Sequence, residues 1–297
     1  VDFVLLDAEG QRIGDAVAYR DERTEGVREA LERDYGLTFA EHYARTGIQY
    51  QKFNTVYQLM ALKQEHPDQL AAAKMFLMVP DYLNYLLCGV AANEYTNAST
   101  TALVGADSKD WDDAMIAMLG LPRDIFQSIK TAGTVLGHLT PEMQAKVGFD
   151  AEVILPATHD TGSAFLAVPA RDEFAAYLSS GTWSLLGVEN AAAITSADSC
   201  AVNFTNEGGY EYRYRYLKNI MGLWMIQSVR RELGEQNGTR PSFPELIAAA
   251  KEAADFASCV DPNDSRFLAP TSMIAEVKAA CADTHQPMPQ TTGEVMQ

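Results

Sequence analysis

PATHDTGS, residues 156–163, is the stretch that decides the fold predicted for this chain. The apolar run 153–155 precedes it and is typical of a buried strand, and the small residues at 163–168 can begin a helix. The stretch therefore connects a strand to a helix, and the predicted fold class is α/β. Ligands of open α/β sheets bind beyond the carboxyl ends of the strands, so Asp160 is expected at a ligand site.

A strand–turn–strand pattern follows, in which the turn SSGT (179–182) separates AAYL (175–178) from WSLLGV (183–188). Gly181 has no side chain to keep phosphate oxygens away from the backbone, and Thr182 adds a hydroxyl donor. We interpret this turn as a contact for a nucleotide phosphate. Taken alone, SSGT fits any tight turn, but its position close to Asp160 within one α/β unit favours the functional interpretation.

Asp160 is interpreted as the base that takes a proton from a sugar hydroxyl. A hydroxyl is a poor nucleophile until a base removes its proton, and a carboxylate suffices for phosphoryl transfer, where positioning and charge neutralisation supply most of the catalysis. Neighbours on an extended chain face opposite ways, so His159 is not expected to orient Asp160. His159 is expected to donate a hydrogen bond to a substrate oxygen. An isolated His-Asp pair is more often structural.

The composition is that of a soluble globular protein with two domains. Of the 297 residues, 47% are hydrophobic and 21% are charged, and apolar runs such as 75–80 are too short to span a membrane. A cytoplasmic location without a membrane partner is expected. The net charge of −17 repels nucleic acids, and the 23 Lys and Arg residues are scattered along the sequence. Phosphate groups are therefore expected to be held by backbone N–H groups and a metal ion.

The cysteines Cys88, Cys200, Cys259 and Cys281 show neither CxxC spacing nor clustering with histidine. This pattern argues against zinc and against a disulfide framework. Reduced thiols are the favoured interpretation, and a pair between Cys259 and Cys281 is the alternative.

Two segments near the C-terminal half have clear local patterns. Residues 210–216 alternate aromatic and charged side chains, which predicts a half-buried strand, and 205–209 is predicted as the turn before it. A helix is predicted from 218 to 233, with Asn219 and Gln227 on one stripe. Amides on such a stripe need partners, which a ligand could supply, or a backbone cap in the case of Asn219.

The N-terminal half contains further local signals. Residues 80–89 have Pro in the first turn and Gly after the last, which predicts a helix with Asp81 as a capping residue. Residues 16–21 are predicted as a short strand, and 55–58 as a capping box that opens a helix. The hydroxyl-rich segment 93–101 suits a sugar site, although such runs are commonly loops.

Motifs over nearly the whole chain, taken together, carry a resemblance to a known family. They are VDFVLLD (1–7), AYRDERT (18–24), GIQYQKFNT (47–55), PDYLNYLLCG (80–89), EYTNAST (94–100), ATHDTGSA (157–164), AYLSSGTWSLLG (176–187), TNEGGYE (205–211), YLKNIMGLWMIQ (216–227) and DPNDSRF (261–267). The chain resembles the FGGY family of carbohydrate kinases, and within it the members that phosphorylate L-rhamnulose. The density of the motifs makes the resemblance specific to that subfamily.

The resemblance implies two actin-like, RNase H-like α/β domains with the active site in the cleft between them. Residues 1–168 are expected to form the sugar-binding domain and residues 169–297 the nucleotide-binding domain. The implied reaction uses ATP and Mg²⁺ to transfer the γ-phosphoryl group to O1 of L-rhamnulose, which gives L-rhamnulose 1-phosphate and ADP. The implied partners are therefore the ketose and ATP, with no nucleic acid and no membrane.

The resemblance also implies roles for particular residues, by matching positions. Asp160 is the catalytic base, and His159, Asp160 and Thr161 line the sugar. Thr182, with Gly181 beside it, contacts ATP. Asn219 is a substrate contact and Gln227 a nucleotide contact. None of these residues is assigned as a metal ligand.

The chain departs from the family pattern at both ends. It starts at Val1 within an expected strand, without the family's phosphate-binding hairpin and its metal-serving Asp, and it lacks the Gly-rich adenosine-binding segment. We therefore expect a fragment of a longer protein, with the base but only half of the ATP site, and little activity on its own.

Other functions compete with this interpretation. Within the same family, the ketose could be fuculose or xylulose. From another class, the chain could be a sugar-binding module without phosphoryl transfer. A hydrolase using Ser179 or Ser180 is disfavoured, because the sequence has no GxSxG elbow there.

Overall fold

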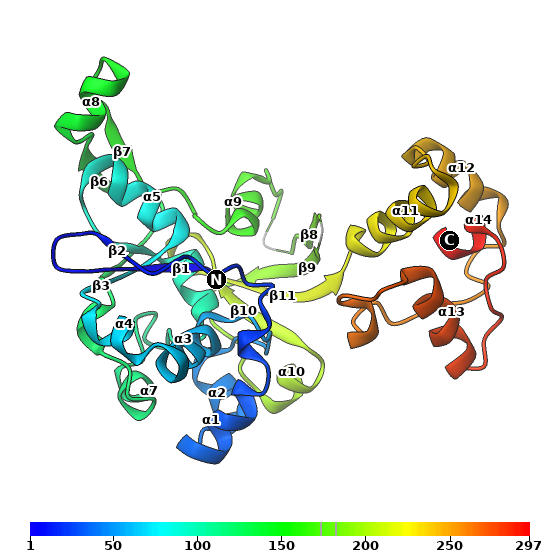
Figure 1. The fold of residues 1–297 in the computed structure, drawn as a ribbon, viewed down its shortest axis with the longest axis horizontal. Coiled ribbons are helices and arrows are strands. Elements are labelled where there is room, and N and C mark those ends of the chain that lie inside the picture. Colours follow the sequence, from blue (N-terminus) through cyan, green and yellow to red (C-terminus); the bar gives the residue numbers. More distant parts are fainter. Residues whose placement is uncertain (173, 182) are drawn as a thin grey trace. The chain divides into compact units, whose positions relative to one another are not determined.

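The computed structural model describes residues 1–172, 174–181 and 183–297 (Figure 1). By their internal contacts these residues divide into two compact units. Unit 1 contains Val1–Tyr177 and Gly187–Lys218, and unit 2 contains Leu178–Leu186 and Asn219–Gln297. Both helices and sheets are present, so the predicted α/β class is confirmed. The domain boundary expected at residue 168 stays a prediction.

The strands of the described residues form four sheets. In chain order, the strands are β1 (Phe3–Leu6), β2 (Arg12–Ile13), β3 (Met75–Met78), β4 (Asn93–Glu94), β5 (Ile129–Lys130), β6 (Val135–His138), β7 (Glu152–Ile154), β8 (Tyr177–Ser180), β9 (Trp183–Asn190), β10 (Phe204–Gly208) and β11 (Tyr214–Met221). The sheet orders are β2-β1-β3, β10-β11-β9-β8, β4-β5 and β6-β7. The strand predicted at 153–155 is β7, which among the described residues pairs with β6 alone; Val153 is its buried residue, and Leu155 is buried just after it.

The helices of unit 1 are α1 (Val27–Tyr35), α2 (Phe39–Thr46), α3 (Thr55–Glu65), α4 (Pro67–Ala72), α5 (Val79–Cys88), α6 (Tyr95–Ala98), α7 (Asp113–Met118), α8 (Pro141–Val147), α9 (Asp160–Ala167) and α10 (Ala197–Ala201). Its 3₁₀ turns are η1 (Glu22–Thr24), η2 (Ser99–Thr101), η3 (Arg123–Ile125) and η4 (Tyr210–Tyr212). Unit 2 contains α11 (Leu223–Asn237), α12 (Phe243–Glu252), η5 (Ser265–Phe267), α13 (Met273–Asp283) and α14 (Thr292–Met296).

The core of unit 1 forms around β1 and its partner β3. All four residues of β1 are buried, and β1 pairs with β3 in antiparallel register, with Phe3 opposite Met78. Phe76 of β3 packs against Trp111 and Phe126, with ring centroids 6.2 and 5.1 Å away. Aromatic contacts of this kind add to the stabilisation that burial of apolar area supplies.

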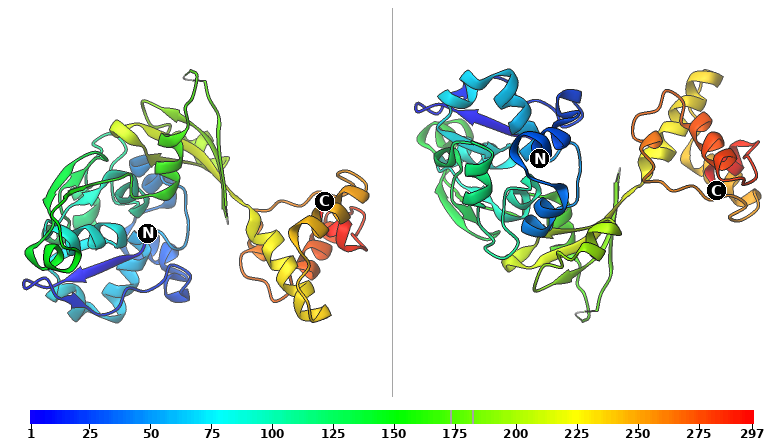
Figure 2. Two further views of the ribbon diagram at one scale, coloured as in Figure 1. Left: turned by 90° about the horizontal axis from the view of Figure 1, so that it is seen from above. Right: turned by 90° about the horizontal axis from the view of Figure 1, so that it is seen from below.

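Unit 2 is built mainly from helices that enclose a second apolar core. In this unit α14 packs on α12, and α13 packs on α11 (Figure 2). Phe267 is fully buried among them. A capping box starts α12, where Ser242 and Glu245 exchange side chain to backbone hydrogen bonds.

Several local predictions are wrong, and between residues 204 and 221 the reason is the antiparallel pairing of β10 with β11. Residues 16–21 form no strand, and Asn54, not Thr55, is the N-cap of α3. The predicted turn at 205–209 lies mostly in β10, while 210–212 forms the turn η4. The predicted helix from residue 218 begins only at Leu223, because β11 extends to Met221.

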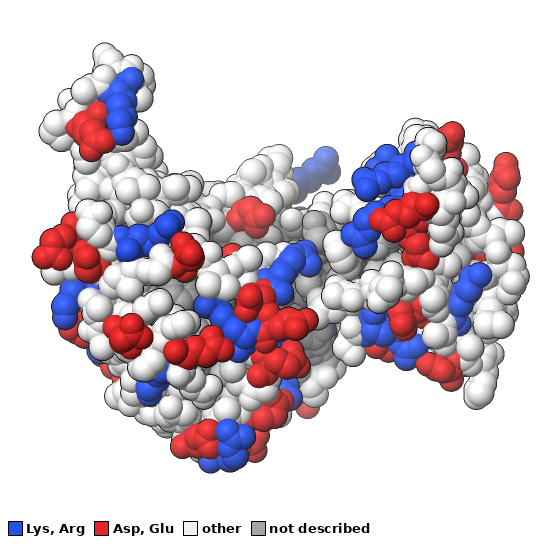
Figure 3. Space-filling view, viewed as in Figure 1, with Lys and Arg blue, Asp and Glu red and all other residues white. Residues whose placement is uncertain are grey.

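Three general properties of the described residues complete the description. No helix in the described part of the chain combines the length and the apolar character that a membrane span needs. The cysteines are free thiols, as favoured from the sequence, with Cys281 buried and Cys259 exposed. On the face drawn in Figure 3, acidic and basic side chains are mixed within each unit. The cytoplasmic location stays a prediction.

We predict that Gly187→Ala destabilises the protein by about 1–3 kcal/mol, because overpacking a close contact forces the backbone to move. A methyl group on Gly187 of β9 would lie 2.3 Å from the Tyr216 carbonyl oxygen and 2.6 Å from Leu217 Cα. Urea unfolding would measure the loss. The control is Gly181→Ala, whose methyl group would lie 3.5 Å from the nearest atom, the carbonyl oxygen of Trp183. Equal stability of the two variants would contradict the prediction.

Candidate active site

The first turn of α9 presents Asp160. His159 is the N-cap residue, with an extended backbone (φ −79°, ψ 119°), and Asp160 is the first helical residue, earlier than the predicted start at Ser163. The Asp160 carboxylate accepts the Thr161 backbone N–H at 2.7 Å, and the Asp160 side chain is 98% exposed. The positive end of the helix dipole stabilises a negative charge here. The turn thus holds an exposed carboxylate in a defined place.

A buried carboxylate fixes the backbone that leads to Asp160. Glu94 is fully buried, and its Oε2 accepts the Thr158 backbone N–H at 3.0 Å and the Thr158 hydroxyl at 3.1 Å. The same oxygen accepts the Thr96 hydroxyl, and Thr96 Oγ1 in turn accepts the His159 backbone N–H at 3.2 Å. Hydrogen bonds to a charged group are about twice as strong as neutral ones. Glu94 therefore anchors both residues that precede Asp160.

Asp81 supports this anchor from α5. Its side chain accepts Asn93 Nδ2 at 3.1 Å and the Glu94 backbone N–H at 3.2 Å. Burial raises the pKa of Asp81 from its ordinary value of 3.8 to about 7. The predicted capping role is wrong, because Asp81 bonds to β4 and is 1% exposed.

Arg215 of β11 lies behind His159. Its side chain is fully buried, its Nε donates to the Gly208 carbonyl at 3.0 Å, and one terminal nitrogen donates to His159 Nδ1 at 2.9 Å. The other terminal nitrogen lies 3.2 Å from Glu207 Oε2. A buried cation therefore connects the imidazole to strand β10.

The expectation that His159 and Asp160 face opposite ways is wrong. His159 Nε2 lies 3.6 Å from Asp160 Oδ1. The two-residue alternation holds along a strand, whereas here an extended N-cap is followed by a helical residue. The distance is too long for a hydrogen bond, but it places one edge of the imidazole beside the carboxylate.

The environment makes His159 neutral. Burial lowers the pKa of His159 well below its ordinary value, and the positive charge of Arg215 lowers it further. Burial raises the pKa of Glu207, and Arg215 partly offsets that rise. Burial lowers the pKa of Arg215, yet a guanidinium starts so far above neutrality that it stays charged.

In unit 2, the turn after β8 lies against the start of α11. The Gly181 carbonyl accepts the Leu223 backbone N–H at 3.0 Å, and a methyl group on Gly222 would meet Ser184 Oγ at 2.4 Å. The turn therefore approaches the N-terminus of a long helix, where backbone N–H groups and the helix dipole favour anions. Thr182, predicted to contact ATP, lies outside the described residues.

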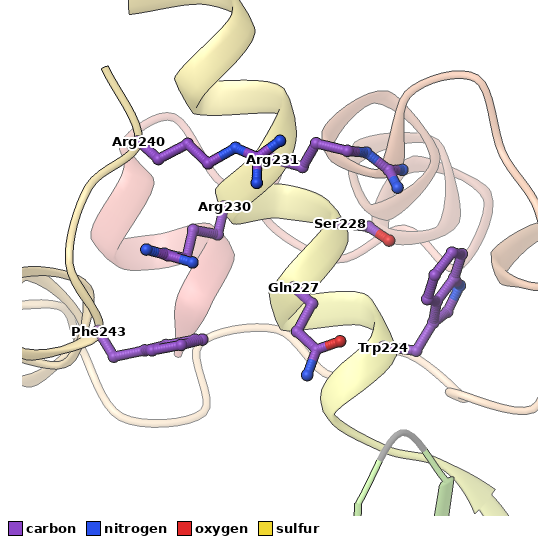
Figure 4. Close-up of a pocket in the computed structure, with 7 residues that line it drawn as sticks. All are labelled: Trp224, Gln227, Ser228, Arg230, Arg231, Arg240 and Phe243. Atoms are coloured by element: carbon purple, nitrogen blue, oxygen red, sulfur yellow. The ribbon is translucent and has the colours of Figure 1, made fainter.

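Gln227 lines a cavity of about 320 Å³ on α11 (Figure 4). The other lining residues are Trp224, Ser228, Arg230, Arg231, Arg240 and Phe243. The Arg230 guanidinium lies 4.7 Å from the Phe243 ring centroid, and that of Arg231 lies 5.6 Å from the Trp224 ring centroid. Three arginines thus gather around one cavity, which the scatter of basic residues along the sequence did not predict.

The predicted site residues fall into two groups. His159, Asp160 and Thr161 are consecutive in unit 1, whereas Asn219 and Gln227 belong to unit 2. Asn219 lies in β11 and Gln227 in α11, so the predicted common helical stripe is wrong. Within the described ranges, no group of three or more His, Cys, Asp or Glu residues is arranged to hold a metal ion.

Comparison with known families decides the affiliation. Residues 1–167 match the N-terminal domain, and residues 176–297 the C-terminal domain, of the FGGY family of carbohydrate kinases. The chain belongs to the FGGY family. The matched regions include the Asp160 turn in the first domain and Gly181 and Gln227 in the second.

Individual relatives show which members of the FGGY family this chain is similar to. Two proteins named rhamnulokinase, from Oceanobacillus iheyensis and Halalkalibacterium halodurans, are 52% and 53% identical to this chain over 295 residues. The alignments cover 99% of this chain and 61% and 62% of those proteins. The chain therefore spans about three fifths of the length of these curated relatives, and the resemblance to rhamnulose kinases is confirmed.

A solved structure of a xylulose kinase has the same fold. The crystal structure of xylulose kinase from Rhodospirillum rubrum matches all of this chain and 59% of that one, with a TM-score of 0.75 at 18% identity. The predicted two-domain, actin-like fold is confirmed.

We predict that Asp81 makes the stability of unit 1 depend on pH. The folded state binds a proton up to a pKa of about 7, whereas the unfolded carboxyl loses it near 3.8, so stability is highest at low pH and falls as the pH rises toward 7. Asp81→Asn removes this loss. Relative to wild type, the variant should gain up to about 4 kcal/mol between pH 4 and 7.5. Urea unfolding at several pH values measures it, and a constant difference would refute the prediction.

Proposed function

We propose that a polypeptide of the relatives' full length that contains these residues, here called the extended polypeptide, is an ATP-dependent sugar kinase. It transfers the γ-phosphoryl group to O1 of L-rhamnulose and releases L-rhamnulose 1-phosphate and ADP. The observation that carries the proposal is the exposed Asp160 carboxylate on an anchored turn, with the Nε2 edge of His159 3.6 Å away. The identity of 52–53% to proteins named rhamnulokinase supports L-rhamnulose as the sugar.

Asp160 acts as the general base in this proposal. As the bond from the sugar O1 to the γ-phosphorus forms and the bond from that phosphorus to ADP breaks, the carboxylate takes the proton of the hydroxyl. His159 and Thr161 orient the sugar beside it. Asn219 is proposed as a further sugar contact. The sugar domain is proposed to end near residue 168, and residues 169–297 belong to the nucleotide domain.

Unit 2 supplies the proposed nucleotide contacts. Gly181 and Thr182 approach the phosphates, and the proximity of Gly181 to the N-terminus of α11 favours an anion there. Gln227 contacts the nucleotide from a cavity whose arginines suit negative charge. Mg²⁺ bound to the phosphates would neutralise their charge. The proposal assigns that ion no ligand among the described residues.

Two alternatives are less well supported. Kinases for fuculose or xylulose share the family, but the relatives described above are named for rhamnulose. A sugar-binding module without catalysis could also use the Asp160 carboxylate to accept hydrogen bonds from sugar hydroxyls, but the relatives described above are named as kinases. A panel of ketoses separates the substrates, and sugar binding without ADP release would favour the module.

We predict that Asp160→Asn in the extended polypeptide lowers kcat for L-rhamnulose by about 10²–10⁴, because the amide cannot take the proton. KM for ATP should change little. A coupled assay of ADP release measures both constants. Asp124→Asn, which changes an exposed carboxylate of η3, is the control and should keep wild-type turnover. Undiminished turnover by the Asp160 variant would overturn its assignment as the base.

We predict that Gln227→Ala raises KM for ATP by roughly two- to twelvefold, which corresponds to one neutral hydrogen bond of 0.5–1.5 kcal/mol. KM for the sugar should stay the same. The control is Gln236→Ala, because Gln236 is an exposed residue of the same helix. If both variants changed KM for ATP equally, Gln227 would have no specific nucleotide contact.

A further inference from the structure

We propose that Arg215 is a positioning residue that fixes the tautomer of His159, so that Nε2 carries the proton and presents it beside Asp160. The inference deepens the proposed function and its catalytic consequence rests on it. Arg215 is fully buried in unit 1 and is not itself placed to touch a substrate. Any effect of Arg215 on the reaction therefore has to pass through its hydrogen bond to His159.

The hydrogen-bond chemistry of the guanidinium decides which nitrogen of His159 is protonated. A guanidinium has N–H donors and no acceptor. Because Arg215 donates to His159 Nδ1 at 2.9 Å, Nδ1 must be the unprotonated, accepting nitrogen. In a neutral imidazole the single proton then resides on Nε2. A proton on Nδ1 would place two donors against each other.

Glu207 holds Arg215 in this orientation. Glu207 Oε2 lies 3.2 Å from one terminal nitrogen of Arg215, and the Gly208 carbonyl accepts the Nε proton at 3.0 Å. Glu207 Oε2 also lies 3.4 Å from His159 Nδ1, farther than the Arg215 nitrogen. The shorter contact belongs to an obligate donor, so it sets the tautomer. Two residues of β10 thus hold the guanidinium that β11 carries.

The consequence lies at the other edge of the ring. His159 Nε2 is 3.6 Å from Asp160 Oδ1, longer than a hydrogen bond, so Asp160 does not accept its N–H, which can instead be donated to a substrate oxygen near the carboxylate. With the opposite tautomer, Nε2 would offer a lone pair, which could not donate to the hydroxyl oxygen and would compete with Asp160 for the hydroxyl proton. The tautomer therefore decides whether a hydroxyl can be oriented there.

The first experiment is ¹⁵N NMR of the histidine side chains in this chain. The chain has five histidines, and His159→Gln assigns the signals of His159. We expect an unprotonated Nδ1 and a protonated Nε2 in the wild type. Arg215→Met combined with Glu207→Gln removes both buried charges, so no unpaired charge remains, and it should shift the Nδ1 signal toward that of a protonated nitrogen. The single variant Arg215→Lys keeps a cationic donor, so its His159 signals should lie closer to those of the wild type than the signals of the double variant do.

The control is Arg213→Met. Arg213 lies two positions earlier, is 39% exposed and pairs with Glu189 at 3.4 Å, so its loss should leave the His159 signals unchanged. A protonated Nδ1 in the wild type would overturn the proposal. So would an unchanged His159 tautomer in the double variant.

The second experiment measures the extended polypeptide. The double variant should lower kcat by roughly 10–100-fold, by analogy with the loss of a hydrogen-bond partner that orients a metal-bound histidine, with KM for ATP unchanged. Unchanged kcat would refute the positioning role even if the NMR result held. If the wild-type extended polypeptide phosphorylated no sugar, the proposed function would fail, while the NMR result would still decide the tautomer.

Discussion

The hydrogen bonds of one buried carboxylate determine where Asp160 lies. Glu94 Oε2 accepts both the backbone N–H and the hydroxyl of Thr158, and through Thr96 it also fixes the His159 backbone N–H. A loop before a helix has no ladder of its own to hold it, and its backbone donors must find partners. Here the partner is the buried carboxylate of Glu94, so the loop is fixed to the core by hydrogen bonds.

Burying several charged groups in one small domain is costly unless they are bonded to one another or to the backbone. Unit 1 meets this condition by linking its buried acids to neighbouring donors. Asp81 accepts Asn93 and the Glu94 backbone N–H, Glu94 accepts two threonines, and Glu207 faces Arg215. The raised pKa of Asp81 shows that the compensation is incomplete there, because burial outweighs its hydrogen bonds. Buried Asp81 therefore lowers the stability of unit 1 near neutral pH, while its hydrogen bonds help to fix the backbone at Glu94.

The sequence predicted the parts of the fold that local patterns specify. Helix α5, with Pro80 in its first turn and Gly89 just after its last residue, is confirmed because its signals lie within a few residues. The anchors of the site could not be predicted in this way. Arg215 sits in an alternating aromatic and charged run, which favours exposure of the charged residues, yet it is fully buried. Its acceptors come from β10, which was predicted as a turn, and from His159, 56 residues away in sequence.

The adjacency of His159 and Asp160 follows from the way a helix begins. An N-cap residue keeps an extended backbone while the next residue is already helical, so their side chains need not alternate as in a strand. The imidazole has one nitrogen on each side of its ring. One nitrogen accepts from the buried Arg215, and the other lies beside an exposed carboxylate. The imidazole of His159 thus connects the buried charge of Arg215 to the site. Two consecutive residues can make this connection because the turn that carries them is held by hydrogen bonds to Glu94 and Thr96.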